Sequence, residues 1–220
     1  VYYWMWATGI VFMIYHFTEA HLWMLPYFRE NFIQNIALQW KSGGSYVGSW
    51  NMLVYGTALF VMSKISGDES YAVSKKAFFF YFLGLTNLMF GWAHHIYIVP
   101  TAPWIRYFAY GISMTEWIIL FSIIYDWKKN LSKEKQTKFL LAYRLMILAD
   151  FWVFLNIILA LLISIPSINL FTHGTHITVA HSMGTTIGIN TLILLSSIAF
   201  IIDSENKFTL VSEKRIAFGS

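Results

Sequence analysis

The sequence predicts an all-α integral membrane protein, a bundle of about six transmembrane helices, and three observations support this. Of its 220 residues, 57% are hydrophobic and only 12% are charged, whereas soluble domains carry roughly 25% charged residues. No segment keeps the apolar–polar alternation of a strand, and only helices and closed barrels satisfy their backbone in lipid. The lysines lie in gaps between long apolar segments. The pI near 9.2 therefore reflects membrane orientation, and no nucleic-acid partner is expected.

Each apolar segment approaches the ~20 residues that cross a hydrocarbon core of ~30 Å. The first ends in a polar stretch, the second closes at Lys64, and the third is charge-free up to Pro100. The fourth has one central acid, the fifth ends at Pro166, and the last is charge-free. The expected helices are about 2–25, 46–64, 77–99, 105–126, 139–166 and 175–202, in a single membrane domain 1–220 with a cytoplasmic tail 203–220.

Basic residues are distributed unevenly between the two faces that six crossings would create. One face receives Lys64, Lys75, Lys76, Lys128, Lys129, Lys133, Lys135, Lys138, Lys207, Lys214 and Arg215. The opposite face receives only Arg29, Lys41 and Arg106. Because cytoplasmic loops carry the excess of Lys and Arg, we expect both termini in the cytoplasm. The chain contains no cysteine, which excludes disulfides, iron–sulfur clusters and c-type heme attachment within it.

The seven histidines all fall in the outer half of this topology. They are His16, His21, His94, His95, His173, His176 and His181. His94, His95 and His181 come from separate helices but lie at similar depths, and neutral imidazole binds iron, copper, zinc and heme. The alternative is that they hydrogen-bond lipid headgroups within an aromatic belt that includes Trp92 and Trp104.

Glu116 is an acid in the middle of an apolar helix. Ionisable groups inside a membrane span usually face a functional interior. One interpretation is a proton-handling acid near a cofactor, and the other is a structural hydrogen bond to a facing helix.

Two sequence strings resemble a known family. They are Gly91-Trp92-Ala93-His94-His95-Ile96-Tyr97 and Thr172-His173-Gly174-Thr175-His176-Ile177-Thr178-Val179-Ala180-His181. In this order they resemble the catalytic (large, cytochrome b) subunit of bacterial nitric oxide reductase, in the heme–copper oxidase superfamily. The similarity extends from about Trp40 to Ile202 and includes Lys64-Ile65-Ser66-Gly67 and the neighbourhood of Ser113 to Glu116.

The resemblance implies a role for each matching residue. His94 and His95 match two ligands of a non-heme iron, His181 matches the axial ligand of one b-type heme, and Glu116 matches an acid that delivers protons. It further implies reduction of NO (or O2), a cytochrome c-type or quinol electron donor, and a bacterial inner membrane with the histidines toward the periplasm. The non-heme metal could also be copper.

Several positions depart from the family pattern. Met183 replaces a low-spin heme ligand, while Gly43 and Val47 replace a third metal-binding histidine and a glutamate. His21 lies on the correct side to substitute as a metal ligand. The chain also has fewer helices than a complete catalytic subunit, so we expect other membrane subunits to supply the missing ones.

Three functions remain open from the sequence. The first is a redox subunit that binds heme through His181. The second is a non-catalytic structural or assembly subunit of a respiratory complex that has lost metal ligands. The third is a transporter or channel that uses Glu116 and the histidines for protons.

Overall fold

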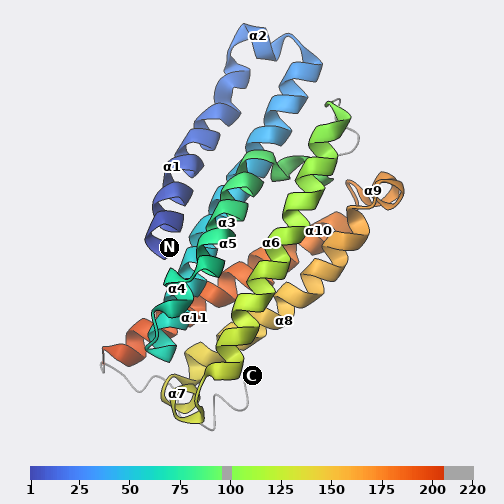
Figure 1. Ribbon diagram of the computed structural model, residues 1–220. Helices are drawn as coiled ribbons and strands as arrows, with labels where there is room; N and C mark the ends of the chain where they lie inside the picture. The colour runs from blue at the N-terminus through green and yellow to red at the C-terminus, as the bar shows by residue number, and fades with distance from the viewer. Residues whose placement is uncertain (96–100, 206–220) are drawn as a thin grey trace.

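The structure, a computed structural model, describes residues 1–95 and 101–205 (Figure 1), with only the backbone described at 94, 95, 117 and 166. The helices are α1 (Tyr2–Ala20), α2 (Pro26–Arg29), α3 (Phe32–Ser66), α4 (Ser70–Val73), α5 (Lys75–Phe90), α6 (Pro103–Asn130), α7 (Lys133–Lys138), α8 (Leu140–Ile163), α9 (Pro166–Thr172), α10 (His176–Met183) and α11 (Leu192–Ser204). Two 3-10 turns, η1 (His21–Met24) and η2 (Gly91–His95), and a π-helical segment, η3 (Gly184–Thr191), join them. These residues contain no strand, which confirms the all-α prediction.

Three helical stretches among the described residues are long and apolar enough to cross a membrane. They are Pro103–Asn130, Leu140–Ile163 and the continuous stretch His176–Ser204. The chain is therefore a multi-pass membrane protein. The count of six crossings stays a prediction, since α5 has only 16 residues and α1 is rich in Tyr and Trp, which are only weakly apolar.

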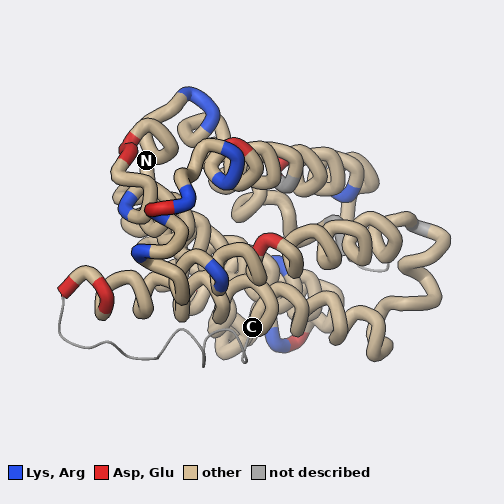
Figure 2. The backbone as a smooth tube through the Cα atoms, turned by 90° about the horizontal axis from the view of Figure 1, so that it is seen from below, with Lys and Arg blue, Asp and Glu red and all other residues tan. Residues whose placement is uncertain are grey.

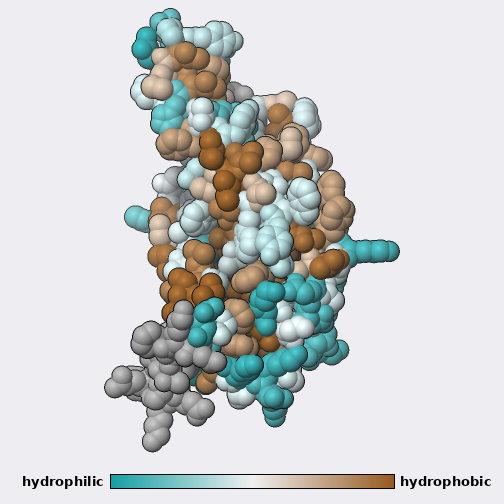
Figure 3. All heavy atoms as spheres, turned by 90° about the vertical axis from the view of Figure 1, so that its left-hand side faces the viewer, coloured by the Kyte–Doolittle hydropathy of each residue, from teal (hydrophilic) through white to brown (hydrophobic). Residues whose placement is uncertain are grey.

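Successive long helices run in alternating directions (Figure 1), so α2 and α9 lie at one end of the bundle and α4 and α7 at the other. Long helical stretches carry no charged residue (Figure 2). On the face covered by α1, apolar and weakly polar residues separate hydrophilic residues that lie toward the two ends (Figure 3). This distribution matches a bundle whose middle lies in lipid and whose ends lie in water.

Helix α3 begins at Phe32, well before the expected residue 46. The Asn31 side chain caps it by accepting a hydrogen bond from the backbone N–H of Gln34 at 3.2 Å. It ends at Gly67, whose φ of 64° is the left-handed conformation common just after a helix. The first part of α3 is polar, so its apolarity gave no signal of a helix there.

Other helices also end at residues that differ from the expected ones. Helix α1 gives way to η1 at His21, and α5 gives way to η2 at Gly91, so both stop short of the expected ends 25 and 99. Positions 96–100 of the expected third helix, and 206–220 of the expected tail, lie outside the described residues. The expected sixth helix, 175–202, is observed as three consecutive segments, α10, η3 and α11.

Glycines let the helices approach α3 closely. A Cβ at Gly9 of α1 would lie 2.9 Å from the Ser49 carbonyl oxygen, and one at Gly48 would lie 2.8 Å from the Cα of Leu88 in α5. Small residues at such crossings allow the close backbone packing that holds helices together in lipid. The buried core of the bundle includes Met62 and Trp127, and the indole Nε1 of Trp127 donates to the Met62 carbonyl at 3.0 Å.

Charged contacts tie the connections together at the end that carries α4 and α7. The Lys76 ammonium lies 2.6 Å from an Asp126 carboxylate oxygen and joins α5 to α6. In the turn before α4, the Ser70 backbone N–H donates to Asp68 at 2.8 Å and lowers the pKa of that exposed carboxyl. Such exposed interactions order the loops and add little stability.

Candidate functional site around His181

His181 lies in α10, close to the start of the π-helical segment. Gly174, with φ of 73°, makes the turn before α10. The Thr175 hydroxyl then caps the helix by accepting from the Ile177 N–H at 3.2 Å. Six residues after Thr175, the His181 Nδ1 lies 3.1 Å from the side-chain amide of Asn156 in α8. Short π-helical segments within α-helices frequently occur at functional sites.

The surroundings of His181 fit an axial heme ligand. The Asn156 side-chain amide, 3.1 Å from Nδ1, holds the imidazole ring in place, as a hydrogen bond to one ring nitrogen commonly does for histidine ligands. Apolar side chains of α10 remain about half exposed within the chain: Ile177 at 45%, Val179 at 49% and Met183 at 48%. An imidazole on an apolar helix surface matches what a b-type heme requires, although Met183 itself replaces a family histidine.

The backbone that carries His94 and His95 lies beside α3. Gly44 makes this possible, because a Cβ there would lie 2.3 Å from the Cβ of Trp92 in η2. The side chains of His94 and His95 are outside the described part of the structure, so their assignment as metal ligands stays a prediction.

Gly43 and Val47 lie on one face of α3, which is exposed near the start of the helix and buried toward its end. A Cβ at Gly43 would meet nothing within 4 Å, and Val47, one turn further, is 52% exposed. On the same strip toward the other end of the helix, Val54 and Val61 are 1% and 0% exposed. The two positions where the family carries a histidine and a glutamate thus border open space on α3.

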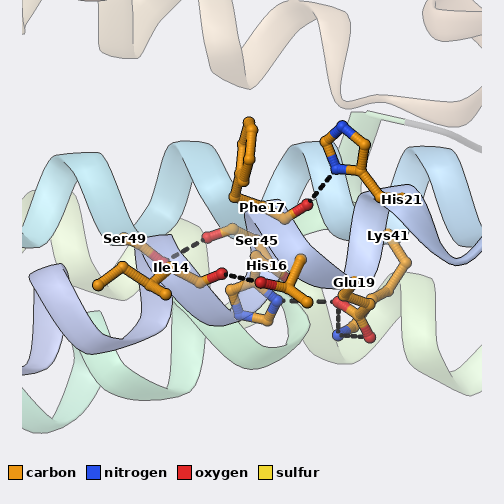
Figure 4. Close-up of polar contacts among 9 residues, drawn as sticks. Ile14, His16, Phe17, Glu19, His21, Lys41, Ser45 and Ser49 are labelled. Atoms are coloured by element: carbon orange, nitrogen blue, oxygen red, sulfur yellow. Dashed lines mark hydrogen bonds and ion pairs between the residues drawn. The ribbon is translucent and has the colours of Figure 1, made fainter.

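His21 shares a cavity with Gly43, and its role as a metal ligand stays a prediction. The cavity, of about 340 Å³, is lined by His16, Phe17, Ala20, His21, Ser42, Gly43 and Tyr46. The His21 Nδ1 lies 2.7 Å from the Phe17 carbonyl oxygen, and the rings of His16 and His21 point in different directions (Figure 4). Within residues 1–95 and 101–205, no three His, Cys, Asp or Glu side chains form a group that could hold a metal.

A polar network at the C-terminal end of α1 was not predicted from the sequence. The Glu19 carboxylate binds the Lys41 ammonium of α3 at 2.6 and 2.7 Å and the Nδ1 of buried His16 at 2.9 Å (Figure 4). The spacing of three residues between His16 and Glu19 is a signal that could have suggested half of this contact. Lys41, in the polar stretch that was not expected to be helical, gave no such signal.

Glu116 is 2% exposed and lies where α6 faces α5. It accepts a short hydrogen bond from the Asn87 side-chain amide, whose oxygen in turn accepts from the Ser113 hydroxyl at 2.9 Å. Gly84 of α5 lies beside this pair, where a Cβ would come 2.6 Å from the Met52 sulfur and 3.4 Å from a Glu116 carboxylate oxygen. The structural hydrogen bond considered from the sequence is therefore present, and the role in proton delivery stays a prediction.

Comparison with known proteins defines the class of this membrane bundle. The family model described as "Cytochrome C and Quinol oxidase polypeptide I" matches residues 1–217. The chain therefore belongs to this family, subunit I of the heme–copper oxidases, whose members typically bind heme and associate with other membrane subunits. Neither a curated protein nor a solved structure matches the chain.

Proposed function

We propose that this chain is a heme-binding redox subunit of a membrane respiratory complex, of the nitric oxide reductase type. The observation that carries the proposal is the position of His181 on α10, where its Nδ1 lies 3.1 Å from the Asn156 side chain and its neighbours Ile177, Val179 and Met183 form an exposed apolar surface that would cover one b-type heme. Membership of the heme–copper oxidase family supports the same reading.

The chain's own residues have distinct roles in this proposal. A bound heme would supply one-electron transfer and a coordination position for a diatomic gas. His181 binds it, and the exposed apolar residues of α10 cover it and exclude water. Glu116 would hold a proton beside the Asn87 amide, which Ser113 holds in turn. Transfer of this proton toward the substrate is the role that the resemblance assigns.

The finer parts of the proposal rest on the sequence. Nitric oxide as the substrate, in place of oxygen, is supported by the two histidine-containing strings. A non-heme iron or copper would depend on His94, His95 and a further ligand such as His21, and we derive no step through it. A cytochrome c-type or quinol donor would supply electrons, and other membrane subunits the missing helices. The bacterial inner membrane, with both termini in the cytoplasm, is part of the same proposal.

A specific observation favours a second candidate, a non-catalytic structural or assembly subunit. Gly43, Val47 and Met183 stand where the family carries ligands, and the described residues form no three-ligand metal group. This candidate predicts a folded chain without heme.

A heme assay separates the two candidates. The chain, purified with its native partners, is analysed by pyridine hemochrome spectroscopy beside His181→Ala and a matched control, His176→Ala. His176 is an exposed histidine in the same helix. We expect one heme per chain in the wild type and in His176→Ala, and a loss of at least tenfold in His181→Ala. No heme in the wild type contradicts the proposal and supports the non-catalytic candidate.

A further inference from the structure

We propose that the flank of α8 around Asp150 is the docking surface for a transmembrane helix of a partner subunit, and that this helix carries a lysine or arginine opposite Asp150. The inference rests on one part of the proposed function, the association with other membrane subunits, and it does not depend on heme. It assigns a role to an acid that neither the family resemblance nor the heme site uses.

Asp150 lies near the middle of α8, one of the helices that are long and apolar enough to cross a membrane. Both ends of α8 are roughly 15 Å or more away at 1.5 Å per residue, so the side chain lies deep in the hydrocarbon core. It is only half-buried within the chain. A carboxyl group in hydrocarbon is costly in its charged and in its protonated form unless it has a hydrogen-bonding partner.

The chain itself does not supply this partner in the part that the structure describes. Within residues 1–95 and 101–205, Asp150 makes no hydrogen bond and no ion pair. Lys128 of α6 is near enough to attract the carboxylate but does not pair with it. Glu116, which is also central in its helix, differs because it accepts a hydrogen bond from Asn87. Asp150 is therefore an acid at membrane depth that needs a partner from another molecule.

The carboxyl group borders an apolar face of α8 that this chain leaves uncovered. Toward the α7 end, Tyr143 packs against Trp127 of α6, with their ring centroids 6.0 Å apart. In the other direction, Phe154 and Ile158 are 53% and 44% exposed. Positions 150, 154 and 158 follow one another at intervals of four residues, so they form one stripe on the helix surface. The stripe has the length and apolarity to contact a second helix.

A helix with a basic residue fits this surface better than other occupants do. Only a helix satisfies its own backbone at this depth, and a lysine or arginine on it gives the carboxylate an opposite charge. A second copy of this chain, docked through the same face by two-fold symmetry, would instead bring two Asp150 carboxyl groups together. Subunits of this family typically associate with other membrane subunits.

Site-directed photo-crosslinking in the assembled complex identifies the occupant. The probe is p-benzoylphenylalanine in place of Phe154, one turn from Asp150, and the same probe in place of Ile10 on α1 is the control, since both positions are about equally exposed. We expect the probe at position 154, and not the control, to crosslink to an apolar segment of another subunit that contains a lysine or arginine. Crosslinks to a second copy of this chain, to lipid alone or to a segment without a basic residue overturn the inference.

Substitutions at Asp150 test the charge. We expect the crosslinked subunit to co-purify about tenfold less with Asp150→Asn than with the wild type, because its basic residue loses its counter-charge. Asp150→Glu keeps the charge and should retain the subunit. The matched control is Asp203→Asn, which removes an acid one residue before the end of α11 and should also retain it. Equal co-purification with Asp150→Asn and the wild type overturns the inference.

Charge reversal excludes a general folding defect. Asp150→Lys should release the subunit, and changing the crosslinked lysine or arginine of that subunit to aspartate should restore its binding to Asp150→Lys. A chain that had merely failed to fold could not be restored in this way. If the reciprocal change restores nothing while the crosslink persists in the wild type, the pairing with Asp150 is wrong.

Heme content in the same preparations separates this inference from the proposed function. Heme that is lost in His181→Ala, with equal co-purification in all Asp150 variants, overturns the docking surface and leaves the heme site standing. A complex that depends on Asp150 but contains no heme supports the docking surface and overturns the redox proposal.

Discussion

At the scale of single residues, the site consists of isolated polar side chains in apolar helices, each with a specific partner. Glu116 shows the principle, because its carboxyl group is held by the Asn87 amide, which is itself held by Ser113. A buried donor that loses its acceptor costs about 1–3 kcal/mol. The residue is thus both a structural contact between α5 and α6 and a candidate proton donor.

Two substitutions separate these roles. Glu116→Gln keeps an oxygen that can accept from Asn87, so we expect stability within about 1 kcal/mol of wild type and loss of nitric oxide turnover. Glu116→Ala removes the acceptor, so we expect it to destabilise the protein by about 1–3 kcal/mol. Denaturant unfolding in detergent measures the free energy of unfolding of each variant, and nitric oxide consumption measures turnover. Unchanged turnover in Glu116→Gln would remove the role in proton delivery.

At the scale of elements, α3 organises the bundle, because α1, α5, η2 and α11 all pack against it. Two adjacent glycines have opposite surroundings there. Gly44 contacts η2, whereas Gly43 borders open space.

These two glycines provide a matched pair of substitutions. Gly43→Ala adds a methyl group in open space and removes a helical glycine, so we expect it to be neutral or to stabilise by about 0.5–1 kcal/mol. Gly44→Ala forces η2 away from α3, so we expect destabilisation of about 1–3 kcal/mol and a change in any metal bound through His94 and His95. Thermal unfolding measures the stability of both variants, and metal analysis measures any change in bound metal. Equal effects of the two substitutions would contradict the close packing of η2 on α3.

Elements were predictable from the sequence where apolarity alone determines them. Helix α8 was expected at 139–166 and found at Leu140–Ile163, because it is strongly apolar apart from Arg144 and Asp150 and ends before a proline. The start of α3 was missed because its polar residues are helical through the Asn31 cap and contacts with α1 and α2. His181 could be named from a sequence string, but Asn156 could not, since only the packing of α8 against α10 brings the two together.

At the scale of the whole molecule, the alternating helices place α2 and α7 at opposite ends of the bundle (Figure 1). Because the chain has no cysteine, single cysteines can report which side of the membrane each end faces. The excess of lysines around α7 predicts the cytoplasm for that end.

Tyr27→Cys in α2 and Glu134→Cys in α7, both at exposed positions, test this topology. We expect a membrane-impermeant maleimide to label Tyr27→Cys in intact spheroplasts and Glu134→Cys only after permeabilisation. The unsubstituted chain is the control, because it should not react at all. Labelling of both variants from the same side would be incompatible with the alternating arrangement.

The π-helical segment Gly184–Thr191 has a consequence for sequence length. Its backbone hydrogen bonds span five residues where an α-helix spans four, so the segment uses more residues than the same rise of α-helix would need. The direction of His181 around the helix axis, relative to the buried face of α11, therefore differs from the direction that a continuous α-helix would give. Deleting one residue here would return the helix to α-helical phase and turn His181 by about 100° relative to α11. The length of this segment, as much as the histidine itself, therefore determines the geometry of the proposed heme site.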